Sequence, residues 1–403
     1  MKKLLYLVHR LPYPPNKGDK ISSHNMLKFF SANWRVHLGT FVDDPDDWQH
    51  VDFVRQFCED SCIVGLPAHR KVTGSMKGLL SGGALSLSYY ANTELQNWVR
   101  STIEKECPDA VLVFSGVMGR FVRGLLPDSV PVVFDAEDVD SEKFRSYAAS
   151  RSWPMSWLYE READKLLAYE RAMAASTDVS IFVSQEEANL FKQLAPESAN
   201  KAHFRTQGVD SSYFDPQLSF ANPYDQGQRV LVFTGAMDYW PNVEAVTWFC
   251  EHALSEIRRR QPDFLFCIVG MKPGEDVQQL GKLPGVRVTG AVDDVRPYLA
   301  HALAACLPLQ LARGIQNKAL EAMAMELPVL ATSDALVGIL EHGESMSVVA
   351  DTPEAMIEGA LDILSQPRRY NRAGRACVVE NYNWDTNLRR MEQFLTREAG
   401  PAQ

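Results

Sequence analysis

The clearest chemical signal in the sequence is the segment from Leu311 to Thr332, LARGIQNKALEAMAMELPVLAT. Its pattern predicts a Gly-containing loop, a helix that begins near Asn317, a tight turn and a short apolar strand. The unpaired N–H groups and the positive dipole end of that helix would face the loop, which suits a diphosphate. Glu321 lies one turn into the helix, where its carboxylate could accept hydrogen bonds from both hydroxyls of a ribose. The segment predicts a nucleotide site, although an ordinary strand–helix–strand unit would show the same pattern.

A cluster of carboxylates, Asp-Ala-Glu-Asp-Val-Asp from Asp135 to Asp140, follows the apolar run Val130–Phe134. Side chains at the carboxyl end of a parallel strand face the crevice where ligands bind. Glu137, Asp138 and Asp140 are therefore candidates for a role in chemistry, and we favour Asp138. Two alternatives stay open, because carboxylate oxygens could also bind Mg²⁺ or cap the helix that follows.

The loop after the first predicted strand is the third candidate. Its sequence from Pro12 to Lys20, PYPPNKGDK, favours an extended loop that ends where Gly18 opens a helix. Gly18, Asp19 and Lys20 would then lie at the edge of the sheet. A plain strand-to-helix turn is the alternative interpretation.

Both halves of the chain alternate short apolar runs with amphipathic helices, which predicts doubly wound α/β sheets. The predicted strands are Leu4–Val8, Val36–Phe41, Cys62–Val64, Ala110–Phe114, Val130–Phe134, Val179–Val183, Val230–Phe233, Phe264–Val269, Val286–Val288, Ala304–Leu307 and Val329–Ala331. The main predicted helices are Ser22–Phe30, Trp157–Ala174, Glu186–Leu194, Glu244–Glu256, Asn317–Met325, Pro353–Leu364 and Thr386–Arg397.

The best linker is residues 216–228, which are rich in Pro, Asn, Gln and Gly and have no periodicity. We therefore predict an N-terminal domain over residues 1–215 and a C-terminal domain over residues 229–375. In the remaining segment, residues 376–403, we expect a helix that crosses back to the N-terminal domain.

Composition narrows the class of protein. The 403 residues carry a net charge of −10, which argues against a nucleic-acid binder. Seven scattered cysteines predict free thiols in a reducing cytoplasm. The apolar run after Lys3 stops at His9, too soon for a signal peptide, and no stretch approaches the roughly 20 apolar residues of a membrane span. We expect a cytoplasmic protein that contacts the inner face of the plasma membrane only peripherally.

One stretch could provide such a membrane contact. His69, Arg70, Lys71 and Lys77 stand beside the apolar and aromatic residues of the segment 79–90. Cations next to such residues could bind anionic lipid headgroups or a lipid-linked acceptor. An ordinary loop and helix is the alternative.

Several segments together resemble the GT-B glycosyltransferases, family 4 in particular, over essentially the whole chain. The segments that carry the resemblance are Glu321–Thr332, Phe233–Val246, Gln207–Asp210 with Phe214, and Val288–Asp293. In that family, Glu321–Thr332 corresponds to the donor-site helix and strand, and Phe233–Val246 to the first strand and loop of the C-terminal domain. Gln207–Asp210 with Phe214 corresponds to the hinge, and Val288–Asp293 to the loop that reads the base. Val133–Lys143 further resembles a subgroup found with bacterial exosortase and exopolysaccharide systems.

The resemblance implies two Rossmann-like domains facing a central cleft. It also implies a retaining, metal-independent transfer of sugar from a nucleotide-diphosphate donor to a glycan or lipid-linked acceptor, with no cofactor. The implied donor-binding residues are Gly235, Asn242, Val292, Asp293, Gly314, Ile315, Gln316, Asn317, Lys318 and Glu321. The implied acceptor-side residues are Gly18, Asp19, Lys20 and Asp140, and the implied catalytic residues are Asp138, Glu137 and Arg313.

Three features depart from the family pattern. Arg313 stands where a Glu approaches the sugar, Glu326 stands where the family has Gly, and the loop from Gly235 to Val243 contains no cation. A diphosphate in a partly dry site needs compensating charge, so our hypothesis is that Arg313 and Lys318 supply it. The Arg313 departure keeps open a nucleotide-sugar-binding protein without catalytic activity, and a GT-B epimerase is the rival enzyme.

Overall fold

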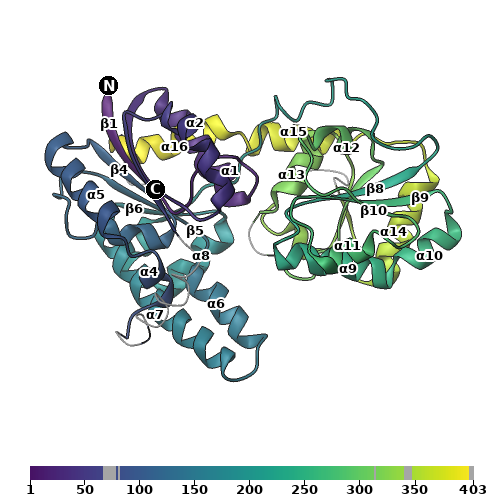
Figure 1. The fold of residues 1–403 in the computed structure, drawn as a ribbon, viewed down its shortest axis with the longest axis horizontal. Helices are drawn as coiled ribbons and strands as arrows, with labels where there is room; N and C mark the ends of the chain where they lie inside the picture. The colour runs from purple at the N-terminus through teal and green to yellow at the C-terminus, as the bar shows by residue number, and fades with distance from the viewer. Residues whose placement is uncertain (67–78, 80–81, 313–314, 340–346, 399–403) are drawn as a thin grey trace. The chain divides into compact units, whose positions relative to one another are not determined.

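The chain folds into two compact units, each built on its own sheet (Figure 1). The computed structural model describes residues 1–66, 79, 82–312, 315–339 and 347–398. The first unit comprises residues 1–205 together with 385–403, and the second comprises residues 206–384. From the sequence we expected boundaries near residues 215, 228 and 375.

The described part of the first unit contains a seven-stranded parallel sheet in the order β3-β2-β1-β4-β5-β6-β7. The strands are β1 Lys2–Val8, β2 Trp34–Val42, β3 Asp60–Gly65, β4 Ala110–Phe114, β5 Val132–Glu137, β6 Val179–Phe182 and β7 Ala202–Phe204. The helices are α1 Gly18–Ser31, α2 Val51–Arg55, α4 Leu85–Tyr89, α5 Thr93–Glu106, α6 Asp140–Ala149, α7 Met155–Ser176, α8 Gln185–Leu194 and α16 Trp384–Thr396. The central strands are continuous apolar runs because helices cover both faces of the sheet.

The described part of the second unit contains a six-stranded parallel sheet in the order β10-β9-β8-β11-β12-β13. The strands are β8 Arg229–Thr234, β9 Phe264–Val269, β10 Val286–Val288, β11 Ala304–Leu307, β12 Val329–Ala331 and β13 Ser347–Val349. The helices are α9 Trp240–His252, α10 Leu254–Arg260, α11 Glu275–Leu280, α12 Arg296–His301, α13 Asn317–Ala324, α14 Pro353–Ser365 and α15 Arg372–Asn381. In Figure 1, α9, α10 and α11 lie on one side of this sheet, and α12, α13 and α15 lie on the other.

The last helix, α16, packs on the first unit although it follows the second along the chain. Leu388, Met391 and Leu395 are each about 1% exposed. The Trp34 indole N–H donates to the Glu392 carboxylate over 2.8 Å. The terminal helix thus completes the core of the N-terminal unit.

A close contact in the second unit explains one glycine of the predicted hinge, Gln207–Asp210. A Cβ on Gly208 would lie 2.3 Å from the ring of Trp384, so only glycine fits beneath that indole. The N–H of Val209 also donates to the Tyr382 carbonyl over 2.9 Å. Together these contacts fix the chain where it enters and leaves this unit.

One helix prediction was wrong. We expected a single helix over Glu244–Glu256, but α9 ends at His252 and α10 starts at Leu254. The backbone φ of −119° at Ala253 breaks the helix there. The break lets Leu254 and Ile257 turn inward and become buried.

All seven cysteines lie in the described ranges, and no disulfide bond joins any two of them. None of the helices within the described ranges has the length and apolar character needed to cross a bilayer.

Candidate functional site

The carboxyl ends of the strands in the second unit bring several predicted donor residues together. Asn242, at the start of α9, is 6% exposed, and its amide N–H donates to the Ala236 carbonyl over 2.8 Å. The Lys318 amine, from the first turn of α13, donates to the Asn242 side-chain oxygen. The same amine lies 4.4 Å from the centroid of the Phe233 ring, a cation–π distance. The loop after β8 is therefore joined to the beginning of α13 through Lys318.

Two glycines make room for this arrangement. A Cβ on Gly235 would lie 2.8 Å from the Asn242 amide nitrogen and 3.2 Å from the Lys318 amine. A Cβ on Gly270, which follows β9, would lie 1.7 Å from the Gly235 carbonyl oxygen. A side chain at Gly270 would therefore displace the backbone at Gly235, and a side chain at Gly235 would displace the side chain of Asn242.

Lys318 and Glu321 stand three residues apart on α13 and influence each other's protonation. Burial lowers the pKa of Lys318 from 10.5 to about 7, and the Glu321 charge only partly opposes this effect. Burial also raises the pKa of Glu321 from 4.5 to about 7, again partly opposed by its neighbour. The two side chains are thus poised to change charge near neutrality, which suits a site where a charged ligand enters.

The rest of the predicted donor segment divides into buried and polar positions. Ile315 is 7% exposed and belongs to the core, so its side chain serves packing. Gln316 is the N-cap residue of α13 and makes no side-chain capping bond. Within the described part of the chain, the side-chain oxygen of Asn317 is buried without a hydrogen-bond partner. Arg313 and Gly314 lie outside the described residues.

The loop after β10 contains the residues predicted to meet the base. Val292 packs partly buried against the core, whereas Asp293 is exposed. The next residue, Asp294, forms an ion pair with Arg296 over 2.8 Å. Arg296 in turn lies 3.7 Å from the centroid of Tyr213.

Sequence reasoning missed Tyr213 and Arg296. Burial and the Asp294 carboxylate raise the pKa of the Tyr213 phenol, and Glu321 adds a smaller effect of the same sign. That influence puts the phenol within electrostatic reach of the predicted ribose-binding carboxylate. The only available sequence signal was that Tyr213 precedes Phe214 in the hinge-like segment.

A second polar cluster lies at the carboxyl end of β1 in the first unit. Asp19, in the first turn of α1, receives hydrogen bonds from His9 over 3.0 Å and Arg10 over 2.8 Å. Arg10 also pairs with Asp43 over 2.9 Å. The hydrogen bonds and charges of His9 and Arg10 hold the pKa of Asp19 well below its ordinary value, against the opposing effect of burial. Asp19 therefore stays ionised, and His9, Arg10 and Asp43 are further residues that the sequence did not identify.

The other acceptor-side residues of this loop fare differently. Gly18 is the first residue of α1. Lys20 is 3% exposed, and its amine pairs with Asp47 over 2.5 Å inside the unit. The acceptor-side role of Lys20 stays a prediction, and in this structure its amine is buried in an ion pair with Asp47.

The end of β5 carries the predicted catalytic carboxylates. Asp135 is fully buried and accepts a hydrogen bond from Arg205 over 2.6 Å. Glu137 has a backbone φ of 63° and lies 3.7 Å from the same guanidinium. Burial raises the pKa of Glu137 well above its ordinary value, with partial opposition from Arg205. Glu137 is thereby favoured as the neutral acid.

Asp138 and Asp140 follow directly. Asp138 is half-buried, and Asp140 is the first residue of α6. The N-cap position of α6 is Val139, whose side chain cannot cap, so neither aspartate takes the N-cap position. Burial raises the pKa of Asp140, and burial with the Asp140 charge raises the pKa of nearby Glu170 to about 7. Within the described ranges, no group of three or more His, Cys, Asp or Glu side chains is arranged to hold a metal ion.

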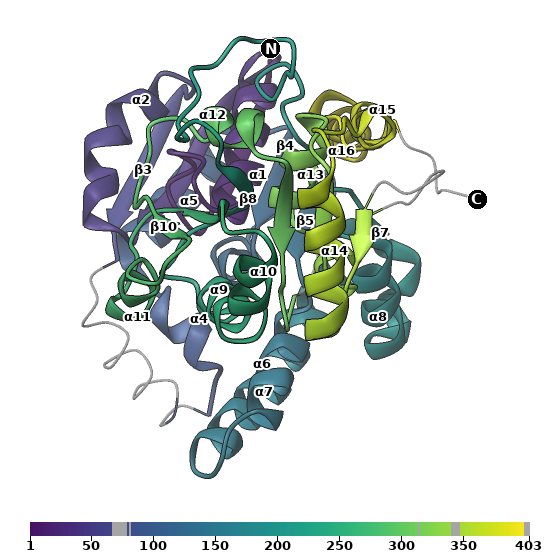
Figure 2. The same cartoon turned by 90° about the vertical axis from the view of Figure 1, so that its right-hand side faces the viewer.

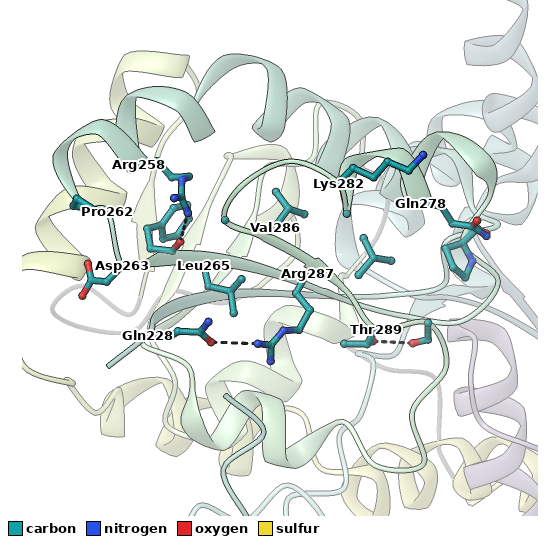
Figure 3. A pocket seen from close by; sticks show the side chains of 16 residues that line it. Gln228, Arg258, Pro262, Asp263, Leu265, Gln278, Lys282, Val286, Arg287 and Thr289 are labelled. Atoms are coloured by element: carbon teal, nitrogen blue, oxygen red, sulfur yellow. Dashed lines mark hydrogen bonds between the residues drawn. The ribbon is translucent and has the colours of Figure 1, made fainter. Parts of the chain in front are cut away.

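A hollow of about 760 Å³ lies elsewhere in the second unit, along the edge strand β10 (Figure 3). Arg258, Lys282 and Arg287 lie along it, and Arg287 is already bonded to Asp225 over 2.9 Å. None of the described donor candidates lines this hollow. The candidate donor site is therefore defined by the loops at the carboxyl ends of the strands, where open α/β sheets bind ligands.

Part of the chain matches a known family, and a longer part matches a known enzyme. Residues 228–366 match the family model described as "Glycosyl transferases group 1". The chain is 28% identical over 257 residues to the GDP-mannose-dependent alpha-(1-6)-phosphatidylinositol monomannoside mannosyltransferase of Mycolicibacterium smegmatis. The match covers 58% of this chain and 66% of that protein, just under two thirds of its length.

Solved structures share the fold over nearly the whole chain. Sucrose-phosphate synthase from Thermosynechococcus elongatus superposes with a TM-score of 0.71 at 16% identity, covering 99% of both chains. Anabaena HepE in complex with UDP and glucose gives 0.67 at 13% identity, covering 98% of this chain and 100% of the other. WaaG, a glycosyltransferase involved in lipopolysaccharide biosynthesis, gives 0.63 at 16% identity, covering 98% and 99%.

The architecture is thus the GT-B fold, with two Rossmann-like domains. Residues 228–366 are thus similar in sequence to the glycosyl transferases group 1.

Proposed function

We propose that the protein transfers a sugar from a nucleotide-diphosphate donor to a glycan or lipid-linked acceptor, with retention of configuration and without a metal ion. The observation that carries the proposal is the position of the Lys318 amine. It lies beside Gly235 at the carboxyl end of β8, on the first turn of α13. A cation and the amino end of a helix there together suit a diphosphate.

The donor would be held at three points. The Glu321 carboxylate would accept hydrogen bonds from the ribose hydroxyls. Lys318 and Arg313 would compensate the charge of the diphosphate, and the loop around Asp293 would contact the base. Tyr213 is a further candidate for a nucleoside contact, because the Glu321 charge contributes to the rise in its pKa.

Bond exchange at the sugar would follow from this placement. The bond from the anomeric carbon to the phosphate oxygen breaks as a bond to the acceptor oxygen forms on the same face. The departing phosphate takes the acceptor proton, so the nucleoside diphosphate leaves with it. Electrostatic stabilisation of that leaving group supplies most of the catalysis. Asp138 and Glu137, at the end of β5, would orient the acceptor or stabilise positive charge on the sugar ring.

The comparisons suggest which donors to try first. The M. smegmatis relative is named as GDP-mannose-dependent, and HepE binds UDP and glucose. Thermal unfolding should therefore be followed with GDP-mannose, UDP-glucose and other nucleotide sugars, because a ligand of the native state raises the unfolding temperature. Absence of a shift with every donor would reject the proposal.

Turnover separates the proposal from its rivals. With the stabilising donor, a transferase makes product only when an acceptor is added, and NMR of the anomeric proton reports retention. Activity that persists in EDTA supports the metal-independent mechanism, and loss in EDTA contradicts it. A changed sugar on the nucleotide without acceptor would indicate an epimerase.

The biological setting belongs to the same proposal. The resemblance of Val133–Lys143 to exosortase-associated enzymes favours cell-surface polysaccharide synthesis in the cytoplasm, at the inner face of the plasma membrane. Of the basic stretch from which we expected membrane contact, His69, Arg70, Lys71 and Lys77 lie outside the described residues.

A further inference from the structure

The connection between α6 and α7 exposes large apolar side chains. α6 ends at Ala149 and α7 begins at Met155, and the two helices extend together away from the sheet of the first unit (Figures 1 and 2). Trp153 is 79% exposed, Trp157 is 53% exposed and Met155 is 41% exposed. Trp153 thus leaves most of its indole in water at the tip of a helical hairpin.

An aromatic cluster apart from these side chains joins the two helices. Below the tip, Phe144 and Tyr147 of α6 meet Tyr159 of α7, with ring centroids about 6.0 Å apart in each pair with Tyr159. The two helices are therefore held together by a separate aromatic cluster. The two tryptophans are not part of this aromatic cluster, and apolar side chains as exposed as theirs indicate a surface that binds something else.

The exposed apolar side chains of the tip lie on more than one side of the hairpin. Met155 and Trp157 are two residues apart on α7, which puts them on nearly opposite sides of a helix with 3.6 residues per turn. A helix that docks in a protein groove presents one apolar face, at spacings of three and four residues. A lipid interface can solvate apolar groups on every side, and tryptophan is enriched at that depth.

The charge of the tip is also compatible with a lipid surface. From Tyr147 to Tyr159 the only charged residue is Arg151, whereas the chain as a whole carries a net charge of −10. Anionic headgroups attract cations and repel a surface rich in carboxylates. This stretch can approach an anionic leaflet without electrostatic repulsion.

We propose that the tip formed by Trp153, Met155 and Trp157 inserts into the headgroup region of an anionic lipid bilayer. It would hold the N-terminal unit at the surface where a lipid-linked acceptor is presented. The inference rests on the proposed function for its purpose, but its test requires no turnover.

The test is flotation of the full-length protein with phosphatidylcholine vesicles, with and without phosphatidylglycerol. The double variant Trp153→Ser/Trp157→Ser removes both indoles, and Trp48→Ser removes a 49% exposed indole elsewhere in the same unit. We expect the wild type and Trp48→Ser to float with the phosphatidylglycerol vesicles. The double variant should bind them at least about tenfold more weakly, because two apolar groups no longer enter the interface.

Circular dichroism and donor-induced thermal stabilisation should be the same for all three proteins, which shows that the fold and the donor site are intact. A wild type that stays with the unbound fraction, or a double variant that floats like the wild type, would overturn the proposal. So would sedimentation showing a wild-type dimer that the double variant loses, because the partner would then be a second copy of the chain. None of these outcomes affects donor binding, so the proposed function is judged separately.

Discussion

The position of Lys318 predicts how donor binding depends on pH. In the donor-free protein, burial lowers the pKa of Lys318 to about 7, so the amine is about half protonated at that pH. A bound diphosphate favours the charged amine and raises its pKa toward the ordinary value. The contribution of the charged amine to donor affinity is therefore greatest at pH values below 7 and is lost as the pH rises above 7.

The size of the effect follows from the same pKa. Each pH unit above about 7 costs roughly a tenfold loss of affinity, because the amine must take up a proton when the donor binds. At about pH 8.5 the donor should bind roughly fifteenfold more weakly than at pH 7, because the amine is already only about half protonated at pH 7. Glu321 acts in the opposite direction. Its pKa of about 7 means that the ionised carboxylate is lost as pH falls, so affinity should decline below pH 7 as well.

The assay is calorimetry with an intact nucleotide sugar, whose two phosphates keep their charge across this range. Wild-type affinity should be highest near pH 7. Lys318→Met should bind more weakly at pH 7 and lose the decline on the alkaline side, whereas Glu321→Gln should lose the decline on the acid side. The control is Lys282→Met, which removes an exposed amine of the same unit and should leave the profile unchanged. A wild-type affinity that stays constant from pH 7 to 8.5, or an alkaline decline that survives in Lys318→Met, would refute a contact between this amine and the diphosphate.

Two further predictions concern stability. Glu326 follows α13 with a φ of 54°, a backbone conformation in which a Cβ is strained. Glu326→Gly should therefore stabilise the protein by about 1 kcal/mol, measured by denaturant unfolding. Glu326→Ala keeps the Cβ and should bring no such gain. Arg205→Met should destabilise the first unit by about 3–5 kcal/mol, because it leaves the buried Asp135 carboxylate without its cation. The control is Arg171→Met, which breaks an ion pair at the surface. Equal losses of stability in the two variants would contradict this reasoning.

The fold was largely predictable from the sequence because parallel strands buried on both faces are continuous apolar runs. Leu4–Val8 and Phe264–Val269 lie within β1 and β9 for this reason. Short elements gave too little pattern, and the three-residue strands β7 and β13 were missed. The break at Ala253 could not be predicted either, since neither Gly nor Pro marks it in the sequence.

The candidate site was predictable as a set of loops but not as a set of contacts. The sequence placed Lys318 at the start of a helix, yet its amine turns toward Asn242, which is 76 residues away in the chain. Nothing local in the sequence showed that the Lys20 amine would be buried in an ion pair with Asp47. Likewise His9 ended an apolar run, and only the fold brings it to Asp19.

The choice of lysine at position 318 has a physical logic. The loop from Gly235 to Val243 has no cation, so in the proposed diphosphate site the positive charge has to come from other residues, and Lys318 of α13 is one of them. While the site is empty, a protonated Lys318 amine near the Phe233 ring has lost part of its hydration, which is unfavourable in free energy. Lysine avoids that cost because its amine can lose a proton near neutral pH and regain it when a diphosphate arrives. An arginine at position 318 would stay charged in both states, so only lysine adjusts its charge to the occupancy of the site.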